Sequence, residues 1–363
     1  MQHQSKSLSA YPCRLRLSIA CALLLSLVAC GGGGGNSGGG GDSITAGITT
    51  TGPGVLSVSP LDTSTLVYAT PLGSLAPPGH VLPTDHVYLM FVDPWTGNVQ
   101  NQDCRARPVY AAGGGIVTFI LQTESAGDTK VMVQMTKTFL YYYDHVLLLP
   151  AVKVGTRVNA GDQIATTTGR CSSIDLGVYD LDVTPPGFVN PSRYGDYGAH
   201  PVSPYKYFSE PLRSVYYSRV RLFEGVPADK DGRVDWGVRA RLAGDWFHSS
   251  LANAPSSTTM GSEGWVKSIS FAYDWFSAAP RISIGGTIAA AGVLAIRNEA
   301  PDPAAVSVSS GLVAYQGSPV MGQVGEGWML VQMLADDRIK VEYFKGATER
   351  AAAFSGAAQE YVR

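Results

Sequence analysis

The sequence carries little charge and no surplus of either sign. Asp, Glu, Lys and Arg make up 15% of its 363 residues, and the formal net charge is −2. Soluble domains typically carry about 25% charged residues. The balance excludes a nucleic-acid binder of the ordinary basic kind, because such proteins cluster lysine and arginine against the phosphates. The composition also excludes a coiled coil and a membrane protein with several spanning helices.

Several catalytic motifs are missing as well. In the strand–turn–helix context that each requires, the sequence has no G-x-S-x-G elbow, no G-x-x-x-x-G-K-[ST] loop and no G-x-G-x-x-G turn. It also lacks the H-E-x-x-H pair of one large class of zinc peptidases. These absences disfavour the enzyme classes that depend on such motifs.

Glycine, in contrast, is abundant. The chain has 42 glycines, well above the usual share of about 7%, and the excess continues beyond the glycine tract at residues 31–41. Such a composition predicts a turn-rich, mainly β protein, and the length suits two domains.

The first 29 residues are typical of an export signal. Positive charges precede residues 17–29, which are uncharged and would form about 20 Å of helix, too short to span a bilayer. The stretch ends in Leu-Val-Ala-Cys at residues 27–30, which resembles a bacterial lipobox. The resemblance implies that residues 1–29 are a lipoprotein signal peptide and that Cys30 becomes lipidated. An ordinary secretory signal with a chance cysteine is the alternative.

A flexible tether follows the predicted lipid anchor. Residues 30–54 are mostly Gly, Ser, Thr and Asn, and about 20 such residues span roughly 25 Å on average. Because Gly31 rather than Asp follows Cys30, the lipobox resemblance implies attachment to a bacterial outer membrane. We favour its periplasmic face, and the cell surface is the alternative.

Two cysteines remain in the exported part. In an oxidising compartment, Cys104 and Cys171 most simply form a disulfide, which would stabilise the fold by about 4 kcal/mol in the chain-entropy model. Two buried free thiols are the alternative. Neither cysteine has the C-x-x-C spacing of a zinc or redox motif.

Residues 55–204 form the first predicted domain. Apolar and alternating runs bounded by turn residues predict short strands there. The runs cover residues 87–92, 108–111, 115–120, 130–135, 141–149 and 152–164.

Five segments of this domain occur in an informative order. A strand with His86 comes first, followed by RPVYAAGGGIV, then YYDHV, then VKVGTRVNAGDQIATTTG, and finally IDLGVYD. Over residues 80–192 this order resembles the lysostaphin-type (LytM-type) zinc endopeptidases, which cut peptidoglycan peptides. The resemblance implies an antiparallel β domain with a substrate groove.

The sequence departs from this family at the zinc ligands. There zinc is held by the His and Asp of H-x-x-x-D and by the second His of H-x-H. Here His86 is followed by Met90, and the H-x-H positions hold Asp175 and Gly177. The Y-x-H histidine is His145. A catalytic zinc needs about three protein ligands, and glycine has no ligand atom.

Two hypotheses follow from these departures. We favour a groove without metal, lined by His86, Met90, His145, Asp175, Gly177 and Asp180. The alternative is a rebuilt metal site in which His86 and Asp175 are ligands, His145 and Asp175 are the catalytic candidates, and Asp85 or Asp144 lies nearby. The remaining histidines beyond the signal segment, His80, His200 and His248, stand alone in the sequence and are expected at the surface.

A helical connection is predicted for residues 205–225, and a second β domain for residues 226–363. Strand patterns at short spacing indicate an antiparallel barrel or sandwich. The patterns cover residues 233–242, 265–276, 281–286, 328–334 and 338–344. The GDWF segment at residues 244–247 resembles the G-x-W of lipocalin-type barrels.

The sequence thus predicts a mainly β, outer-membrane lipoprotein with an inactive LytM-like domain. The resemblance implies that peptidoglycan or a cell-wall hydrolase is the partner; we expect no nucleic-acid partner and no cofactor. One alternative is an active zinc endopeptidase acting on peptidoglycan cross-links. Another is a carrier of a small apolar ligand in the C-terminal domain.

Overall fold

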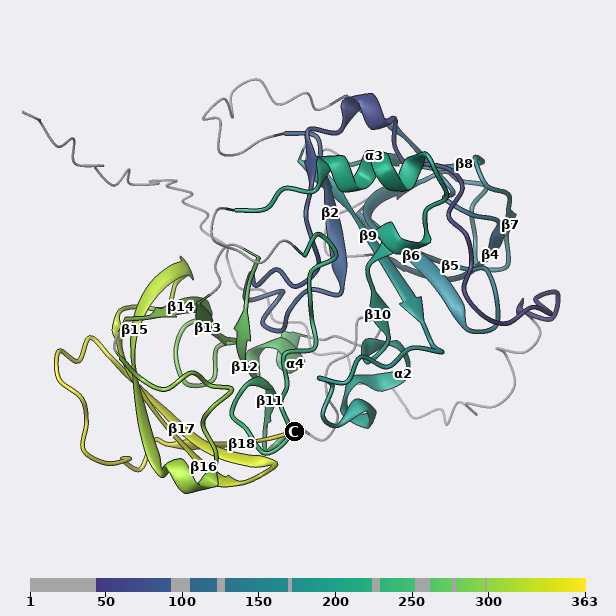
Figure 1. Cartoon of the computed structure of the whole chain (residues 1–363). Coiled ribbons are helices and arrows are strands. Elements are labelled where there is room, and N and C mark those ends of the chain that lie inside the picture. The colour runs from purple at the N-terminus through teal and green to yellow at the C-terminus, as the bar shows by residue number, and fades with distance from the viewer. Residues whose placement is uncertain are drawn as a thin grey trace, which may run out of the picture. The chain divides into compact units, whose positions relative to one another are not determined.

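The computed structural model describes residues 44–92, 105–122, 128–168, 172–223, 229–251, 262–275, 279–297 and 299–363. Cys30, Cys104 and Cys171 lie outside these residues, so the lipid anchor and the disulfide stay predictions. In the described part the chain forms an antiparallel sheet followed by an antiparallel barrel (Figure 1). This confirms the mainly β fold class, and the second domain is a barrel rather than a sandwich. No helix within the described ranges is both long and apolar enough to cross a membrane.

The N-terminal sheet contains ten strands among the described residues, with the main order β1-β2-β9-β6-β5-β4-β7. β10 pairs with β9, while β8 pairs with β3 and β6. The strands are β1 (Tyr68–Ala69), β2 (His86–Met90), β3 (Pro108–Tyr110), β4 (Gly115–Gln122), β5 (Thr129–Gln134), β6 (Phe139–Leu148), β7 (Arg157–Val158), β8 (Gln163–Thr167), β9 (Ser173–Asp180) and β10 (Pro201–Val202).

Both faces of the central strands are buried, which explains their nearly continuous apolar runs. Successive side chains of a strand point to opposite faces. On β6, Tyr141 and Tyr143 therefore join the main hydrophobic core, whereas Tyr142 lies in a small cluster with Tyr179 on the other face. This second face also carries the polar residues described below.

The C-terminal strands β11 to β18 close into a barrel, because β11 pairs with β18 as well as with β12. Closure leaves the barrel without an edge strand. The strands are β11 (Gly244–His248), β12 (Ser268–Tyr273), β13 (Pro280–Ile284), β14 (Gly292–Ile296), β15 (Leu312–Gly322), β16 (Gly327–Ala335), β17 (Arg338–Lys345) and β18 (Gln359–Val362).

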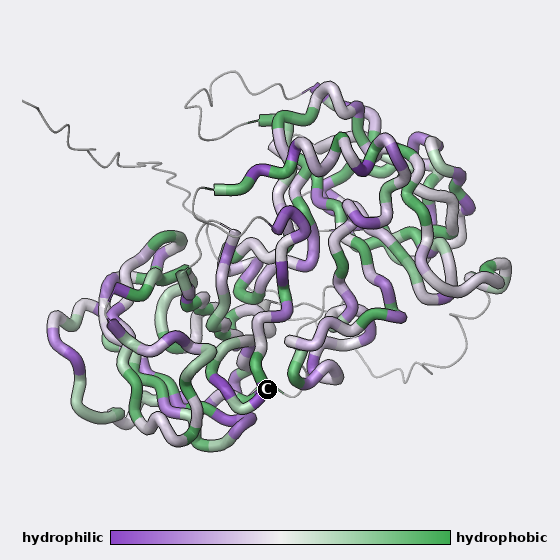
Figure 2. The backbone as a smooth tube through the Cα atoms, viewed as in Figure 1, coloured by the Kyte–Doolittle hydropathy of each residue, from purple (hydrophilic) through white to green (hydrophobic). Residues whose placement is uncertain are grey.

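The barrel core consists of buried apolar side chains. Apolar and polar stretches of the chain follow one another in this part of the molecule (Figure 2). Trp246 of the GDWF segment is fully buried, and the guanidinium of Arg363 lies 4.3 Å from the centre of its ring. Arg363 also donates hydrogen bonds to the carbonyl oxygens of Ala243, Val238 and Asp336. These contacts tie the last strand of the barrel to the first.

Short helices complete the chain. α2 (Gly195–Gly198) lies between β9 and β10, α3 (Leu212–Arg219) lies within the predicted helical connection, and α4 (Ser262–Val266) precedes β12. The 3₁₀ helices are η1 (Thr63–Thr65), η4 (Pro191–Tyr194), η5 (Pro204–Tyr207) and η6 (Val308–Ser310).

The predicted strand at residues 233–242 is absent, since this segment has no regular secondary structure. Side chains make the bonds that a strand ladder would otherwise supply. Arg233 Nε donates to Asp235 Oδ1 at 3.0 Å, and Asp235 Oδ2 accepts the backbone N–H of Gly187 at 2.8 Å. Tertiary contacts thus override the alternating pattern.

Candidate functional site

Three adjacent strands, β2, β9 and β6, place the polar residues of the motifs on one face of the sheet. In the register of these strands, His86 is opposite Gly177, and Gly177 is opposite Tyr142. Asp175 is likewise opposite Asp144 on β6. Because side chains alternate in direction along a strand, Asp175 and Gly177 of β9 point to the same face. The residues opposite them on β2 and β6 point to that face as well.

A β-bulge brings His145 to the same face. Between Thr129 and Val131 the register of β5 with β6 shifts, so that two residues of β6 are opposite one residue of β5. His145 adopts φ 63°, a left-handed conformation that non-glycine residues seldom take. Its side chain therefore reaches Asp175, although Asp144 beside it also faces the site.

His86 and His145 converge on Asp175. Asp175 Oδ2 lies 3.2 Å from Nε2 of His86 and 3.5 Å from Nε2 of His145. Asp175 and His86 are buried, with 1% and 5% of their surface exposed. The structure thus brings together the three residues named in the metal-site hypothesis.

The other ring nitrogen of His86 is held by Asp85. His86 Nδ1 lies 2.9 Å from Asp85 Oδ1 and 3.1 Å from the hydroxyl of Tyr142. Tyr142 donates to Asp85 Oδ1 at 2.7 Å, and Tyr179 donates to Asp85 Oδ2. Because Nδ1 of His86 bonds to Asp85, the other ring nitrogen, Nε2, is the one that faces Asp175.

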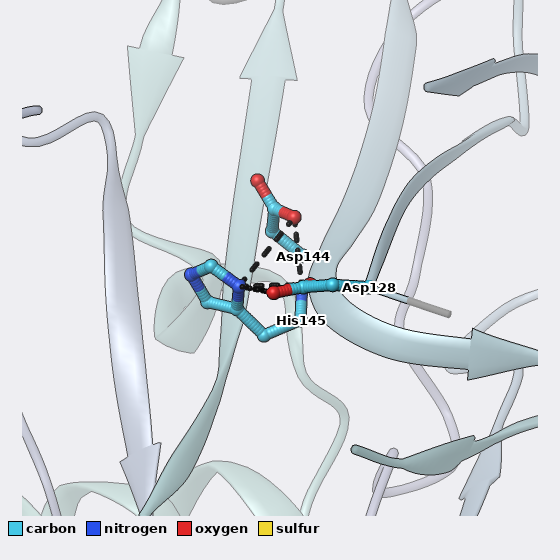
Figure 3. Close-up of side chains that lie close together, drawn as sticks. All are labelled: Asp128, Asp144 and His145. Carbon is cyan, nitrogen blue, oxygen red and sulfur yellow. Dashed lines mark hydrogen bonds and ion pairs between the residues drawn. The ribbon is translucent and has the colours of Figure 1, made fainter. Parts of the chain in front are cut away.

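A second carboxylate holds His145 in the same way (Figure 3). His145 Nδ1 lies 3.0 and 3.1 Å from the two oxygens of Asp128, and Asp144 Oδ1 accepts the backbone N–H of His145 at 2.8 Å. Ligand atoms of Asp128, Asp144 and His145 all lie within 4.8 Å of one another.

Burial and charge shift the pKa values of these groups in opposite directions. Burial lowers the pKa of His86, but Asp175 and Asp85 outweigh it and raise the value to about 10. Burial would raise the pKa of Asp175, but the charge and hydrogen bond of His86 lower it overall. The pKa of Asp144 is raised, chiefly because its carboxylate is buried. Burial and the charge of His86 lower the pKa of His80 to about 4.

A cavity of about 250 Å³ opens beside His86. Its walls combine charged groups, including Lys130 and Asp144, with aromatic residues that include Trp265 of α4. His80 also lines the cavity, with its ring 5.1 Å from that of His86 and 6.0 Å from that of Trp265. The expectation that His80 is an isolated surface residue is therefore wrong.

The site does not fit the zinc centre of the lysostaphin-type endopeptidases. At Gly177, a Cβ atom would lie 2.1 Å from Cε1 of Tyr142, so the tyrosine ring fills the space that a ligand side chain would need. Met90, opposite Ser173 on β9, offers only a thioether, a poor zinc ligand. Of the family's three zinc ligands, only His86 is present at its expected place.

Asp180 does not join this site. On β9 the side chains of Asp180 and Asp175 point to opposite faces of the sheet. Asp180 Oδ2 accepts a hydrogen bond from the hydroxyl of Tyr207, and its Oδ1 accepts the backbone N–H of Asp182. Asp128, Tyr142 and Lys130 also belong to the site, although none of them is a ligand or catalytic position of the motifs. No motif contains Asp128. The three consecutive tyrosines before His145, in contrast, predict that tyrosine side chains lie on both faces of the strand.

Part of the N-terminal sheet matches a known protein family. Residues 99–175 match the model of Peptidase family M23. The comparison with curated proteins found no match. Among solved structures, the chain is similar to Helicobacter pylori Csd3, with 16% identity over 45% of this chain and 39% of that chain, at a TM-score of 0.29.

Two further structures are similar over shorter stretches. LytU is 27% identical over 21% of this chain and 55% of that chain, with a TM-score of 0.19. A zinc-containing peptidase from Vibrio cholerae is 20% identical over 35% of this chain and 37% of that chain, with a TM-score of 0.25. The chain spans less than half the length of the Csd3 and V. cholerae chains that it matches. The match of residues 99–175 establishes that this chain carries an M23 peptidase-type (LytM-like) domain.

Proposed function

We propose that the M23-type domain binds peptidoglycan peptides without the zinc chemistry of its family, and that a lipid anchor holds it at the bacterial outer membrane. The observation that carries the proposal is the contact between Tyr142 and Gly177. One family ligand is replaced by glycine, and a tyrosine ring occupies the space beside it. The groove of an M23 domain implies a peptidoglycan substrate, and this chain retains the groove without the ligand set.

The cavity beside His86 supports recognition of a short peptide. Peptides of the bacterial cell wall carry both carboxylates and amino groups, and this cavity presents both Lys130 and Asp144. Trp265 adds an apolar wall. Small-molecule sites commonly combine such an apolar lining with a few charged groups that orient the ligand.

Binding to purified peptidoglycan sacculi tests this proposal. The wild-type protein is expected to co-sediment with sacculi, and both Trp265→Ala and Lys130→Met are expected to weaken the binding several-fold. Trp328→Ala on β16 and Lys345→Met on β17 are the matched controls, because neither residue lines the cavity. Sedimentation no greater than that of an unrelated tagged protein would contradict the proposal.

The alternative function is peptide hydrolysis through the zinc centre of the family, and an assay of the same protein on sacculi tests it. We expect sacculi incubated with the protein and Zn²⁺ to release no more peptide than sacculi incubated with buffer. Release of cross-link fragments that is lost in His145→Ala would favour the endopeptidase. A cell-wall hydrolase as the partner would instead appear as a complex that forms without sacculi.

The anchor is tested separately. We expect a radiolabelled or clickable fatty acid to be incorporated into the wild-type chain but not into Cys30→Ala, and the variant to leave the membrane fraction. Equal labelling of both proteins would contradict lipidation at Cys30. For the apolar-ligand alternative we find no support, since buried side chains occupy the core of the described barrel.

A further inference from the structure

Another cavity lies on the outside of the barrel. It has a volume of about 210 Å³ and is lined by Leu75, Asp274, Arg281, Val293, Val320 and Met321. Successive side chains of a strand point to opposite faces, and Ile282 and Leu294 belong to the barrel core. Their neighbours Arg281 and Val293 therefore point away from that core. This outer cavity shares no lining residue with the cavity beside His86.

A β-bulge shapes one wall of the outer cavity. Between Val293 and Leu294 the register of β14 with β15 shifts, which leaves Val320 without a partner on β14. An extra residue of this kind bends a strand and redirects a side chain. Val320 and Met321 are adjacent in the sequence, yet both line the cavity, with 53% and 40% of their surfaces exposed. They form an apolar rim that a ligand can reach from solvent.

Leu75 supplies a further apolar wall. It is 2% exposed and packs with Ala272 and Val293 in a small buried cluster. The hydroxyl of the preceding residue, Ser74, accepts a hydrogen bond from Nε1 of Trp275 at 3.3 Å, which ties this segment to the residues that follow β12. Because the wall is held in place, a ligand would not have to order it on binding.

Asp274 and Arg281 supply the charged part of the lining. Nε of Arg281 lies 3.5 Å from Oδ2 of Asp274, and the side chains of Arg281 and Asp274 are only 14% and 8% exposed. Nε of Arg281 is buried and makes no hydrogen bond to the described residues. A guanidinium has five N–H donors in a planar fork, and one neighbouring carboxylate cannot accept from all of them. Because a buried donor without an acceptor costs free energy, a further acceptor in the cavity would stabilise Arg281.

The lining determines the kind of ligand that fits. Its apolar side chains favour a hydrocarbon group, and small-molecule sites typically combine such walls with a few polar groups that orient the ligand. The planar fork of a guanidinium matches the two oxygens of a carboxylate. An apolar cavity of about 150 Å³ accommodates benzene, so a cavity of about 210 Å³ suits a somewhat larger molecule. A small apolar carboxylate meets these requirements of shape, charge and size.

We propose that the outer cavity binds a small apolar molecule with a single carboxylate, which the guanidinium of Arg281 holds. The hydrocarbon part then lies against Leu75, Val293 and the rim formed by Val320 and Met321. This site differs from the interior cavity that an apolar-ligand carrier would need, because buried side chains occupy the interior of the described barrel. The proposal does not depend on peptidoglycan binding, which is measured on sacculi and can succeed or fail by itself.

Titration of the full chain with octanoate tests the proposal. The methionine methyl groups are labelled with ¹³C for NMR, and the variant Met321→Leu assigns the signal of Met321. We expect a saturable shift of that signal with one octanoate per chain, while the signals of Met329 and Met333 in the barrel core stay unchanged. Octylamine, whose head group has the opposite charge, should cause no saturable shift.

Three results of this titration would overturn the proposal. The first is the lack of a saturable shift of the Met321 signal with octanoate. The second is an equal response to octanoate and octylamine, because the guanidinium would then not select the ligand. The third is a shift of the Met329 and Met333 signals without that of Met321, which would place the ligand inside the barrel.

Substitutions identify the parts of the site. Arg281→Met should weaken octanoate binding at least tenfold, because it removes the charge that holds the carboxylate. Val320→Trp should weaken the binding by a similar factor, because the larger side chain blocks the exposed rim. Asp274→Asn should strengthen the binding several-fold, because a competing negative charge is lost. Wild-type affinity in Arg281→Met, or weaker binding in Asp274→Asn, would contradict the role of Arg281.

Two matched controls lie outside the cavity. Arg297→Met removes an exposed arginine that follows β14, and Leu334→Trp enlarges an exposed residue of β16. Neither residue lines the cavity, so both variants should bind octanoate as the wild type does. Arg281→Met leaves Asp274 buried without its partner, which is destabilising. If that variant does not fold, Val320→Trp and the comparison of octanoate with octylamine on the wild type decide the question.

Discussion

The ring of Tyr142 occupies the space into which a side chain at Gly177 would extend, with Cε1 only 2.1 Å from the position of a Cβ atom. The two residues are directly opposite each other on β6 and β9. The glycine is therefore part of the packing of this face, and its hydrogen atom is what allows the tyrosine to reach Asp85 and His86. A ligand at position 177 and a tyrosine at position 142 exclude each other.

Replacing Gly177 with alanine should destabilise the sheet. Overpacking in a buried region costs about 1–3 kcal/mol, and we expect a loss of this size in the free energy of unfolding from denaturant titration. Adding Tyr142→Ala should recover part of the loss, so that the two changes are not additive. Gly356→Ala, where an added Cβ would contact nothing within 4 Å, is the control. Strict additivity of Gly177→Ala and Tyr142→Ala would contradict the exclusion.

The stability of the protein should fall as the pH rises through 4 to 6 because of Asp245. Burial raises the pKa of this carboxyl from 3.8 to about 6, although hydrogen bonds from Ser270 and Tyr194 partly oppose the shift. The unfolded chain therefore releases the proton at lower pH than the folded chain, and folding loses up to about 3 kcal/mol by pH 7 from this group.

Asp245→Asn is expected to remove this contribution while keeping a hydrogen-bonding side chain at the same place. Its midpoint of thermal unfolding should change less between pH 4 and pH 7 than that of the wild type. Asp302 is exposed and accepts a hydrogen bond from Tyr273. The midpoint of thermal unfolding of Asp302→Asn should therefore depend on pH as that of the wild type does. If the unfolding midpoints of Asp245→Asn and the wild type change equally with pH, Asp245 is not the cause of the pH dependence.

Truncation of Arg363 should destabilise the barrel. Its guanidinium donates to three carbonyl oxygens and lies over the ring of Trp246. Hydrogen bonds from a charged donor contribute about 1.5–3 kcal/mol, so we expect Arg363→Ala to lose about 2–4 kcal/mol of unfolding free energy. Arg338→Ala, which removes an exposed ion pair with Glu360, should lose at most about 1 kcal/mol. Similar losses for the two variants would show that the carbonyl contacts add nothing.

Tyr142→Phe should weaken the hold on His86 without disturbing the packing. The change deletes the hydroxyl that donates to Asp85 and lies 3.1 Å from Nδ1 of His86, but it keeps the ring against Gly177. We expect a loss of about 1–2 kcal/mol in unfolding free energy, together with altered chemical shifts of the His86 ring. Tyr141→Phe, which removes a hydrogen bond to the carbonyl of Gly113 on the other face, should leave those shifts unchanged.

The sequence predicted the strands well where burial determines the pattern. The apolar runs around Val87 and Tyr143 lie in β2 and β6, where neighbouring side chains on both faces are buried. The alternation at residues 233–242 led to a wrong prediction, because Asp235 there accepts a hydrogen bond from the backbone N–H of Gly187, far away in the sequence, and no strand ladder forms. Local patterns cannot reveal such long-range partners.

The site was predictable as far as motifs reach. The order of segments led to His86, His145 and Asp175, which the structure brings together. It could not show that a bulge turns the His145 side chain onto the face shared by Asp144, because alternation alone puts neighbouring residues on opposite faces. Lys130 lies in β5 and Asp128 directly precedes that strand, which carries no motif, so only the folded sheet connects the two residues to the site.

The pairing of β2 with β9 also bears on the order in which the protein folds. β4, β5 and β6 pair with neighbours close in sequence and carry Lys130 and His145, whereas His86 reaches Gly177 across most of the domain. Joining distant strands requires the closure of a long loop, whose entropy opposes early contact. We therefore expect the backbone amides of β5 and β6 to gain protection from hydrogen exchange during refolding before those of β2. The chemical groups of this site would then meet only in one of the last steps, after most of the sheet has formed.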